Sequence, residues 1–193
     1  LATLLLALWL EVVGLAMYCL LRPALTPRPG LYAFSKVVGV LVITYIPWLA
    51  VGIGWLSFTP TLMTTVTAVF VALGLVAYRR RPELEFPRGE VRATEILFWG
   101  AFLFFLIIRA FNPEIYWGEK PMDFSFLNSL YRTTTLPPPE PWFAGSPLNY
   151  TYFGYFIVVA AGKCLNIHPA LMFNLAIAMF GGLTAVSVFG AGT

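Results

Sequence analysis

The 193-residue chain is 59% hydrophobic and carries charge on only 11% of its residues. Soluble domains carry charge on roughly 25% of their residues, so this composition argues against an ordinary water-facing globular protein and favours a membrane protein. The formal net charge of +3 is too small to indicate binding to nucleic acid.

Six apolar stretches predict membrane-spanning helices, because a span needs about 20 mostly apolar residues. They cover residues 1–21, 36–56, 61–78, 95–111, 150–165 and 169–189. The sequence therefore predicts an all-α polytopic membrane protein in which the second and third spans form a tight hairpin. We expect residues 1–94 to form a three-helix N-terminal membrane segment, and residues 95–193, with the fourth span, the loop at 112–149 and the last two spans, to form the start of the core. Both ends of the chain lie in or beside apolar runs, which is typical of a fragment of a longer protein.

Basic residues predict the orientation, because Lys and Arg concentrate in short cytoplasmic loops. With six spans, one side carries nine of the twelve: Arg22, Arg28, Lys36, Arg79, Arg80, Arg81, Arg88, Arg92 and Lys163. The other side carries Arg109, Lys120 and Arg132. Residues 112–149 are therefore predicted to be extracytoplasmic.

The loop at residues 112–149 is long for a connection inside a compact fold, and such loops are usually functional or disordered. Its many aromatic residues argue against disorder. Pro121 suits the first turn of a helix, and Phe124, Leu127 and Leu130 follow at helical spacing. The loop is therefore predicted to carry a short amphipathic helix on the membrane surface, with Asp123 in its first turn.

The charged residues in and near this loop each have more than one interpretation. An acid such as Asp123 is favoured in a first turn by the helix dipole alone, whether or not it is catalytic. Arg109 could extend its charge to the membrane boundary, pair with a nearby acid, or bind a lipid phosphate. Glu11 lies well inside the first span, where a carboxylate is costly, so we expect it to face other helices or a cavity.

Four short motifs point to one family. The pieces "NPEI", "EKPMDF", "PPPEPWFAG" and "NYTYFG" all lie within residues 109–154. Together they resemble the signature region of DUF2298 (Chlor_Arch_YYY), a family of polytopic membrane proteins of bacteria and archaea. Where that family often has three consecutive tyrosines, this chain has Tyr150, Thr151 and Tyr152. The resemblance implies a multi-pass protein of the bacterial or archaeal plasma (cytoplasmic) membrane.

That family is in turn similar to the membrane glycosyltransferases of the GT-C type. The similarity implies transfer of a sugar from a polyprenyl-phosphate donor on the extracytoplasmic face. It implies Asp123 as general base or ligand of a divalent metal, with Glu119 as the second candidate. The residues it implies for binding the lipid phosphate, stacking on sugar or lining a lipid groove are Lys120, Arg109, Arg132, Trp142, Tyr150 and Tyr152. The expected partners are membrane lipids, the lipid-linked sugar and the remainder of the full-length protein, and no nucleic acid.

Two other functions stay open from the sequence. Glu11, Arg109 and the Pro and Gly breaks in the spans would fit a transporter, although transporters usually concentrate polar groups near the midplane. A non-catalytic membrane scaffold or assembly protein would use the long loop as a docking surface.

Overall fold

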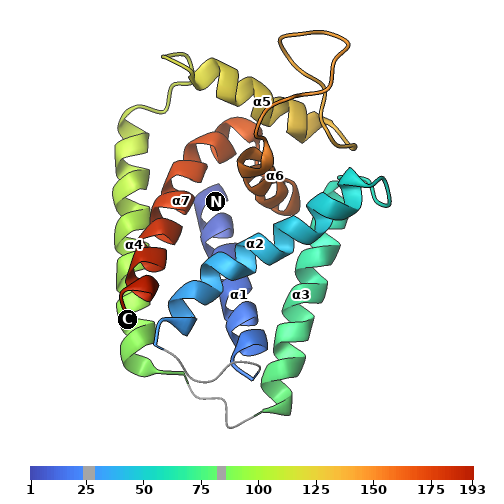
Figure 1. The fold of residues 1–193 in the computed structure, drawn as a ribbon. Helices are drawn as coiled ribbons and strands as arrows, with labels where there is room; N and C mark the ends of the chain where they lie inside the picture. The colour runs from blue at the N-terminus through green and yellow to red at the C-terminus, as the bar shows by residue number, and fades with distance from the viewer. Residues whose placement is uncertain (24–28, 82–85) are drawn as a thin grey trace.

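A computed structural model describes residues 1–23, 29–81 and 86–193, and every regular element in these ranges is a helix. In chain order the helices are α1 (Ala2–Leu21), α2 (Leu31–Gly52), α3 (Pro60–Arg80), α4 (Arg88–Phe111), α5 (Lys120–Arg132), α6 (Phe153–Leu165) and α7 (Pro169–Ala191). Figure 1 shows them as a bundle capped at one end by α5. Five of them (α1, α2, α3, α4 and α7) are long and apolar enough to cross a membrane. The predicted all-α, polytopic membrane class is thereby confirmed.

The hairpin between the second and third spans is present, with boundaries set by local capping. The Thr59 side chain accepts a hydrogen bond from the backbone N–H of Leu62 at 3.1 Å, and Pro60 occupies the first turn of α3. This is a regular N-terminal cap followed by a proline, which has no backbone N–H that would need an acceptor. Helix α2 begins at Leu31, five residues before the predicted start, so Lys36 lies inside the helix and not at the edge of a loop.

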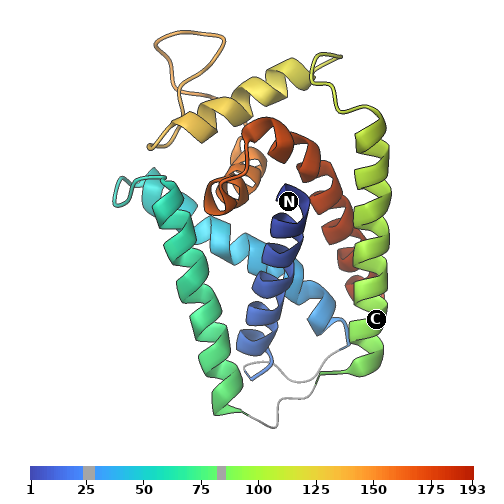
Figure 2. The same cartoon turned by 180° about the vertical axis from the view of Figure 1, so that it is seen from behind.

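The span predicted at residues 150–165 is wrong. Helix α6 has only 13 residues, which rise about 20 Å against about 30 Å of bilayer hydrocarbon. Near its start, Tyr155 bonds to Asp123 of α5, and near its end Lys163 bonds to the carbonyl of Thr133, directly after α5. Both ends of α6 therefore lie at the end of the bundle that α5 caps. The chain enters α7 from that end and runs back to the other (Figures 1 and 2).

This path changes the predicted distribution of basic residues. Among the described residues, the end opposite α5 carries the following arginines: Arg22, Arg79, Arg80, Arg81, Arg88 and Arg92. Lys163 joins Arg109, Lys120 and Arg132 at the α5 end, contrary to the prediction, and Lys36 is buried within the bundle. Arg28 lies outside the described residues. The arginine excess thus stays at the predicted end, but the division of nine against three does not hold.

Glycines allow the helices to approach closely. A Cβ at Gly74 of α3 would lie 2.7 Å from the Cα of Ala16 in α1, and one at Gly182 of α7 would lie 2.8 Å from the Phe98 ring of α4. Both distances are shorter than real contacts allow. Small residues at such positions are the usual means of packing helices in membranes.

Candidate functional site

Helix α5 brings two charged side chains toward the interior of the bundle. It buries Phe126, Leu127 and Leu130 against the ends of the other helices, and this apolar face fixes its rotation. Lys120 and Asp123 lie on its first turn. The predicted amphipathic helix is therefore present, with Asp123 where its position after Pro121 indicated.

Asp123 is held by a tyrosine from another helix. The hydroxyl of Tyr155 in α6 donates a hydrogen bond to Oδ1 of Asp123 at 2.6 Å. Burial, followed by this bond and the Asp123 charge, raises the pKa of Tyr155, so the phenol stays protonated as a donor. One carboxylate oxygen of Asp123 is thus occupied, and among the described residues none donates a hydrogen bond to the other.

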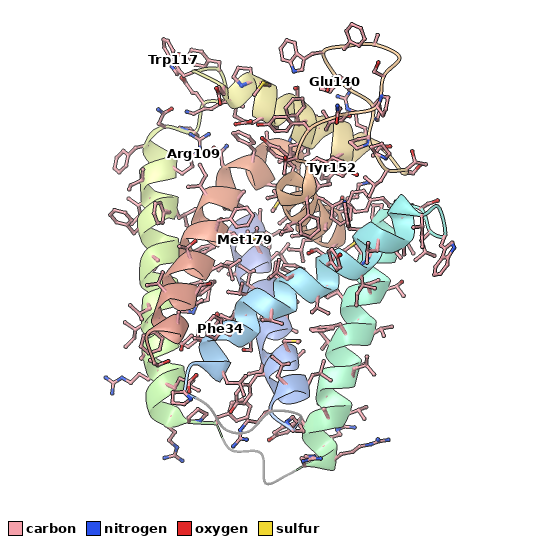
Figure 3. All side chains as sticks on the ribbon, in the orientation of Figure 1. Phe34, Arg109, Trp117, Glu140, Tyr152 and Met179 are labelled. Atoms are coloured by element: carbon pink, nitrogen blue, oxygen red, sulfur yellow. The ribbon has the colours of Figure 1, made fainter. Side chains whose placement is uncertain are left out.

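Arg109 is buried at the end of α4, beside α5 and α7 (Figure 3). Its guanidinium donates to the backbone carbonyls of Asn112 and Glu114, and it lies 5.9 Å from the centre of the Phe173 ring. Its Nε is buried without a hydrogen-bond partner. Lys120 donates to the same Glu114 carbonyl at 3.3 Å. All ion pairs among the described residues involve Lys36, so neither cation is neutralised by a carboxylate there.

One cavity of about 600 Å³ joins these groups. Its polar lining includes Arg109, Lys120, Asp123 and Tyr155, contributed by α4, α5 and α6. The rest is mostly apolar and comes largely from α4, α6 and α7: Phe105, Leu127, Gly154, Val158, Phe173, Ala176, Ile177, Phe180, Gly181 and Thr184. A cavity with cationic and acidic groups in part of its wall and an apolar remainder suits an amphiphilic ligand that carries an anionic head.

Comparison with protein families decides the relationship that the motifs suggested. The model of the family described as "Uncharacterized membrane protein (DUF2298)" matches residues 42–193. The chain belongs to this family. No curated protein and no solved structure matches the chain. The whole lining of the Asp123 cavity lies inside the DUF2298 match, whereas Glu11 and Lys36 precede it.

The other predicted site residues do not line the Asp123 cavity. Glu119 is exposed at the start of α5. Arg132 lines a second cavity of about 710 Å³, between α5 and residues 133–141. Trp142 is 65% exposed and donates through its ring N–H to Ser125 at 2.7 Å, which fixes the proline-rich loop on α5. Tyr150 packs on Phe126, and Tyr152 faces Trp48 of α2.

The sequence reading missed two groups at this end of the molecule. Tyr155 supplies the donor to Asp123, but no local pattern distinguishes it from the other tyrosines of "NYTYFGY". Lys163 is buried and donates to the carbonyls of Phe58 and Thr133 at 2.6 and 2.8 Å. A lone lysine inside an apolar stretch was the available signal for it, and the six-span prediction placed it in a cytoplasmic loop instead.

Proposed function

We propose that the chain is part of a membrane glycosyltransferase that takes a sugar from a polyprenyl-phosphate donor. The observation that carries this proposal is the single cavity in which Arg109, Lys120 and Asp123 share a wall with an apolar surface. A polyprenyl-phosphate sugar has the complementary chemistry: an anionic phosphate, a hydroxyl-rich sugar and a long apolar chain. The α5 end of the bundle is opposite the arginine-rich end, so we place the reaction on the extracytoplasmic face.

The phosphate would bind to Arg109 and Lys120. A buried guanidinium without an acid partner is costly, and a phosphate would supply the missing countercharge. The unsatisfied Nε of Arg109 is a further donor within this region. The apolar residues of α4 and α7 that line the cavity would accept the first isoprene units.

Asp123 would act as general base toward the acceptor. Its free oxygen removes the proton of an acceptor hydroxyl while the acceptor oxygen forms a bond to the anomeric carbon of the sugar. The bond between that carbon and the phosphate oxygen breaks, and polyprenyl phosphate leaves with the electron pair. Tyr155 holds the carboxylate in position, and Arg109 and Lys120 stabilise the charge of the leaving phosphate. Glu119 stays the second candidate base.

The cavity lining does not form a metal cage by itself. Within the described residues, no three His, Cys, Asp or Glu side chains are close enough to hold a metal ion, and Asp123 is the one carboxylate in the lining. Divalent ions such as Mg²⁺ can be held by one carboxylate together with substrate phosphates. Asp123 would thus be the protein ligand of a divalent metal that arrives with the donor, and the proposed sugar transfer needs no such metal.

The proposal is tested by Asp123→Asn in the full-length protein. With a panel of polyprenyl-phosphate sugars and membrane extract as acceptor, we expect transfer to fall by about 100-fold or more, since a general base contributes roughly 10²–10⁴ in rate. Donor binding is expected to persist, because Arg109 and Lys120 are intact. The control is Glu140→Gln on the exposed loop, which is expected to keep the wild-type rate. Transfer at the wild-type rate by the Asn variant would refute the assignment.

A transporter is the second candidate, and one observation favours it. Glu11, Lys36 and Glu95 form a charged cluster within the membrane-spanning part of the bundle, as a transport site would. Flux of an ion or solute across liposomes that contain the full-length protein, without sugar transfer, would support this alternative. A scaffold function has no comparable observation in its favour.

A further inference from the structure

Three charged side chains from three helices meet inside the bundle, outside the lining of the Asp123 cavity. Lys36 of α2 is 1% exposed. Its Nζ donates to Oε2 of Glu11 in α1 and lies 3.0 Å from Oε1 of Glu95 in α4. Tyr32, one turn before Lys36, donates its hydroxyl to the same Oε1 at 2.8 Å. Nothing in the proposed sugar transfer uses these groups.

The surrounding packing holds Lys36 in place. A Cβ at Gly14 of α1 would lie 2.7 Å from Cγ of Lys36, so α1 can approach the lysine stem only with glycine there. On the other side, Nζ lies 4.6 Å from the centre of the Phe98 ring of α4. The ammonium is therefore confined between the two carboxylates.

Of the four carboxylate oxygens of Glu11 and Glu95, three accept a hydrogen bond and one does not. Both oxygens of Glu95 receive donors: Oε1 from Tyr32, and Oε2 from Lys36 at 3.3 Å. Oε2 of Glu11 also receives Lys36. Oε1 of Glu11 is buried and has no hydrogen-bond partner. An anionic oxygen without a donor is the most costly of these arrangements in a membrane interior, whereas a protonated oxygen carries no charge there.

We infer that Oε1 of Glu11 binds a proton and that Glu11, Lys36 and Glu95 form a proton-binding site within the membrane. Two carboxylates and one ammonium sum to a charge of −1, and a single proton makes the cluster neutral. This inference is independent of the proposed sugar transfer, because none of the three residues lines the Asp123 cavity.

The proton is exchangeable without unfolding. Glu11 and Glu95 keep 28% and 26% of their side-chain surface open. Among the described residues, the charged groups that act on Glu11 are Lys36 from α2 and Glu95 from α4. Tyr32 donates its hydroxyl to Glu95 and its backbone N–H to Glu90 at 2.8 Å, and Glu90 lies in the first turn of α4, toward the arginine-rich end. Protons would therefore enter from that end.

Infrared spectroscopy of the full chain in lipid nanodiscs at pH 7 tests this inference. A protonated carboxyl gives a carbonyl band that ionised carboxylates lack and that shifts in D2O. We expect wild type to show the intensity of one such group and Glu11→Gln to show none. In Lys36→Met both glutamates lose their cation, so the intensity is expected to double. Glu140→Gln, on the exposed loop, is the control and is expected to keep the wild-type band.

Three results would overturn the inference. The first is absence of the band from wild type. The second is a band of undiminished intensity in Glu11→Gln, which would assign the proton to another group. The third is a wild-type band that appears in choline chloride and disappears in sodium chloride, which would make the cluster a sodium site. The Glu11→Gln comparison stands if Lys36→Met does not fold, because the amide has nearly the shape of the protonated acid.

Discussion

At the scale of single residues, the α5 end of the molecule contains two buried cations, Arg109 and Lys163. Arg109 lines the cavity that we assign to the donor phosphate, whereas Lys163 joins three segments through two backbone carbonyls and the face of the Phe58 ring. Both side chains lose most of their hydration. Only for Arg109 does the arrangement leave a donor without a partner.

Lys163 makes stability depend on pH. Burial lowers the pKa of its ammonium to about 8, so the folded protein releases this proton near pH 8. The unfolded chain keeps it until about pH 10.4. Between these values the unfolded state binds more protons, so the stability contributed by this group rises with pH. We expect the melting temperature of wild type, relative to that of Lys163→Met, to increase from pH 8 to pH 10. A difference that is constant over this range would contradict the assignment.

The candidate residues differed in how far the sequence could locate them. Lys120 and Asp123 were predictable because Pro121 starts a helix and fixes their turn within it. Arg109 was predictable because a cation near the end of an apolar span is conspicuous. Tyr155 was not, since its role depends on how α6 packs beneath α5, and no local spacing encodes a contact across 32 residues.

At the scale of elements, hydropathy predicted the five long helices among the described residues, but it did not predict that α6 is too short to cross the membrane. An apolar stretch of 16 residues can be a short span or a helix buried among other helices, and composition alone cannot separate the two. Residues 156–163, which make up most of α6, are all buried, and the helix packs against α2, α3, α5 and α7. Its apolar character is therefore explained by contact with protein.

Helix packing through Gly74 can be tested with a matched pair of glycines. Gly74→Ala would place its Cβ 2.7 Å from the Ala16 backbone, which should separate α1 from α3 and cost about 1–3 kcal/mol. Gly100 lies within α4 with nothing within 4 Å of the corresponding Cβ. Gly100→Ala is thus expected to be neutral or stabilising, because alanine favours helix. Unfolding in mixed micelles measures both, and equal effects of the two variants would refute the close α1–α3 contact.

At the scale of the whole molecule, the short length of α6 decides on which side of the membrane residues 166–168 lie. Residues 166–168 follow the four long helices α1–α4 and the short helices α5 and α6, and they lie at the α5 end, where Tyr131 of α5 donates to the carbonyl of Ile167. The six-span prediction placed the same residues on the other side, with the arginines. The sequence could not decide this, because the charge bias favours the same loop orientation for residues 112–149 in either arrangement.

The position of Asn166 distinguishes the two arrangements. Asn166 is exposed directly after α6. In a background with both cysteines replaced by serine, we expect Asn166→Cys to react with a membrane-impermeant maleimide from the same side as Ser146→Cys. Arg81→Cys, at the other end of α3, is expected to react only from the opposite side. Labelling of Asn166→Cys together with Arg81→Cys would support six spans instead.

The central claim is that the cavity around Asp123 binds a polyprenyl phosphate. The most direct measurement is binding of a polyprenyl phosphate to the full-length protein in nanodiscs, followed by native mass spectrometry, with a neutral polyprenol of equal length as the matched ligand. We predict saturable binding of the phosphate to wild type and binding that is at least tenfold weaker in Arg109→Gln. The affinity for the polyprenol is expected to be the same in both proteins. Equal affinity of wild type and Arg109→Gln for the phosphate would contradict the claim.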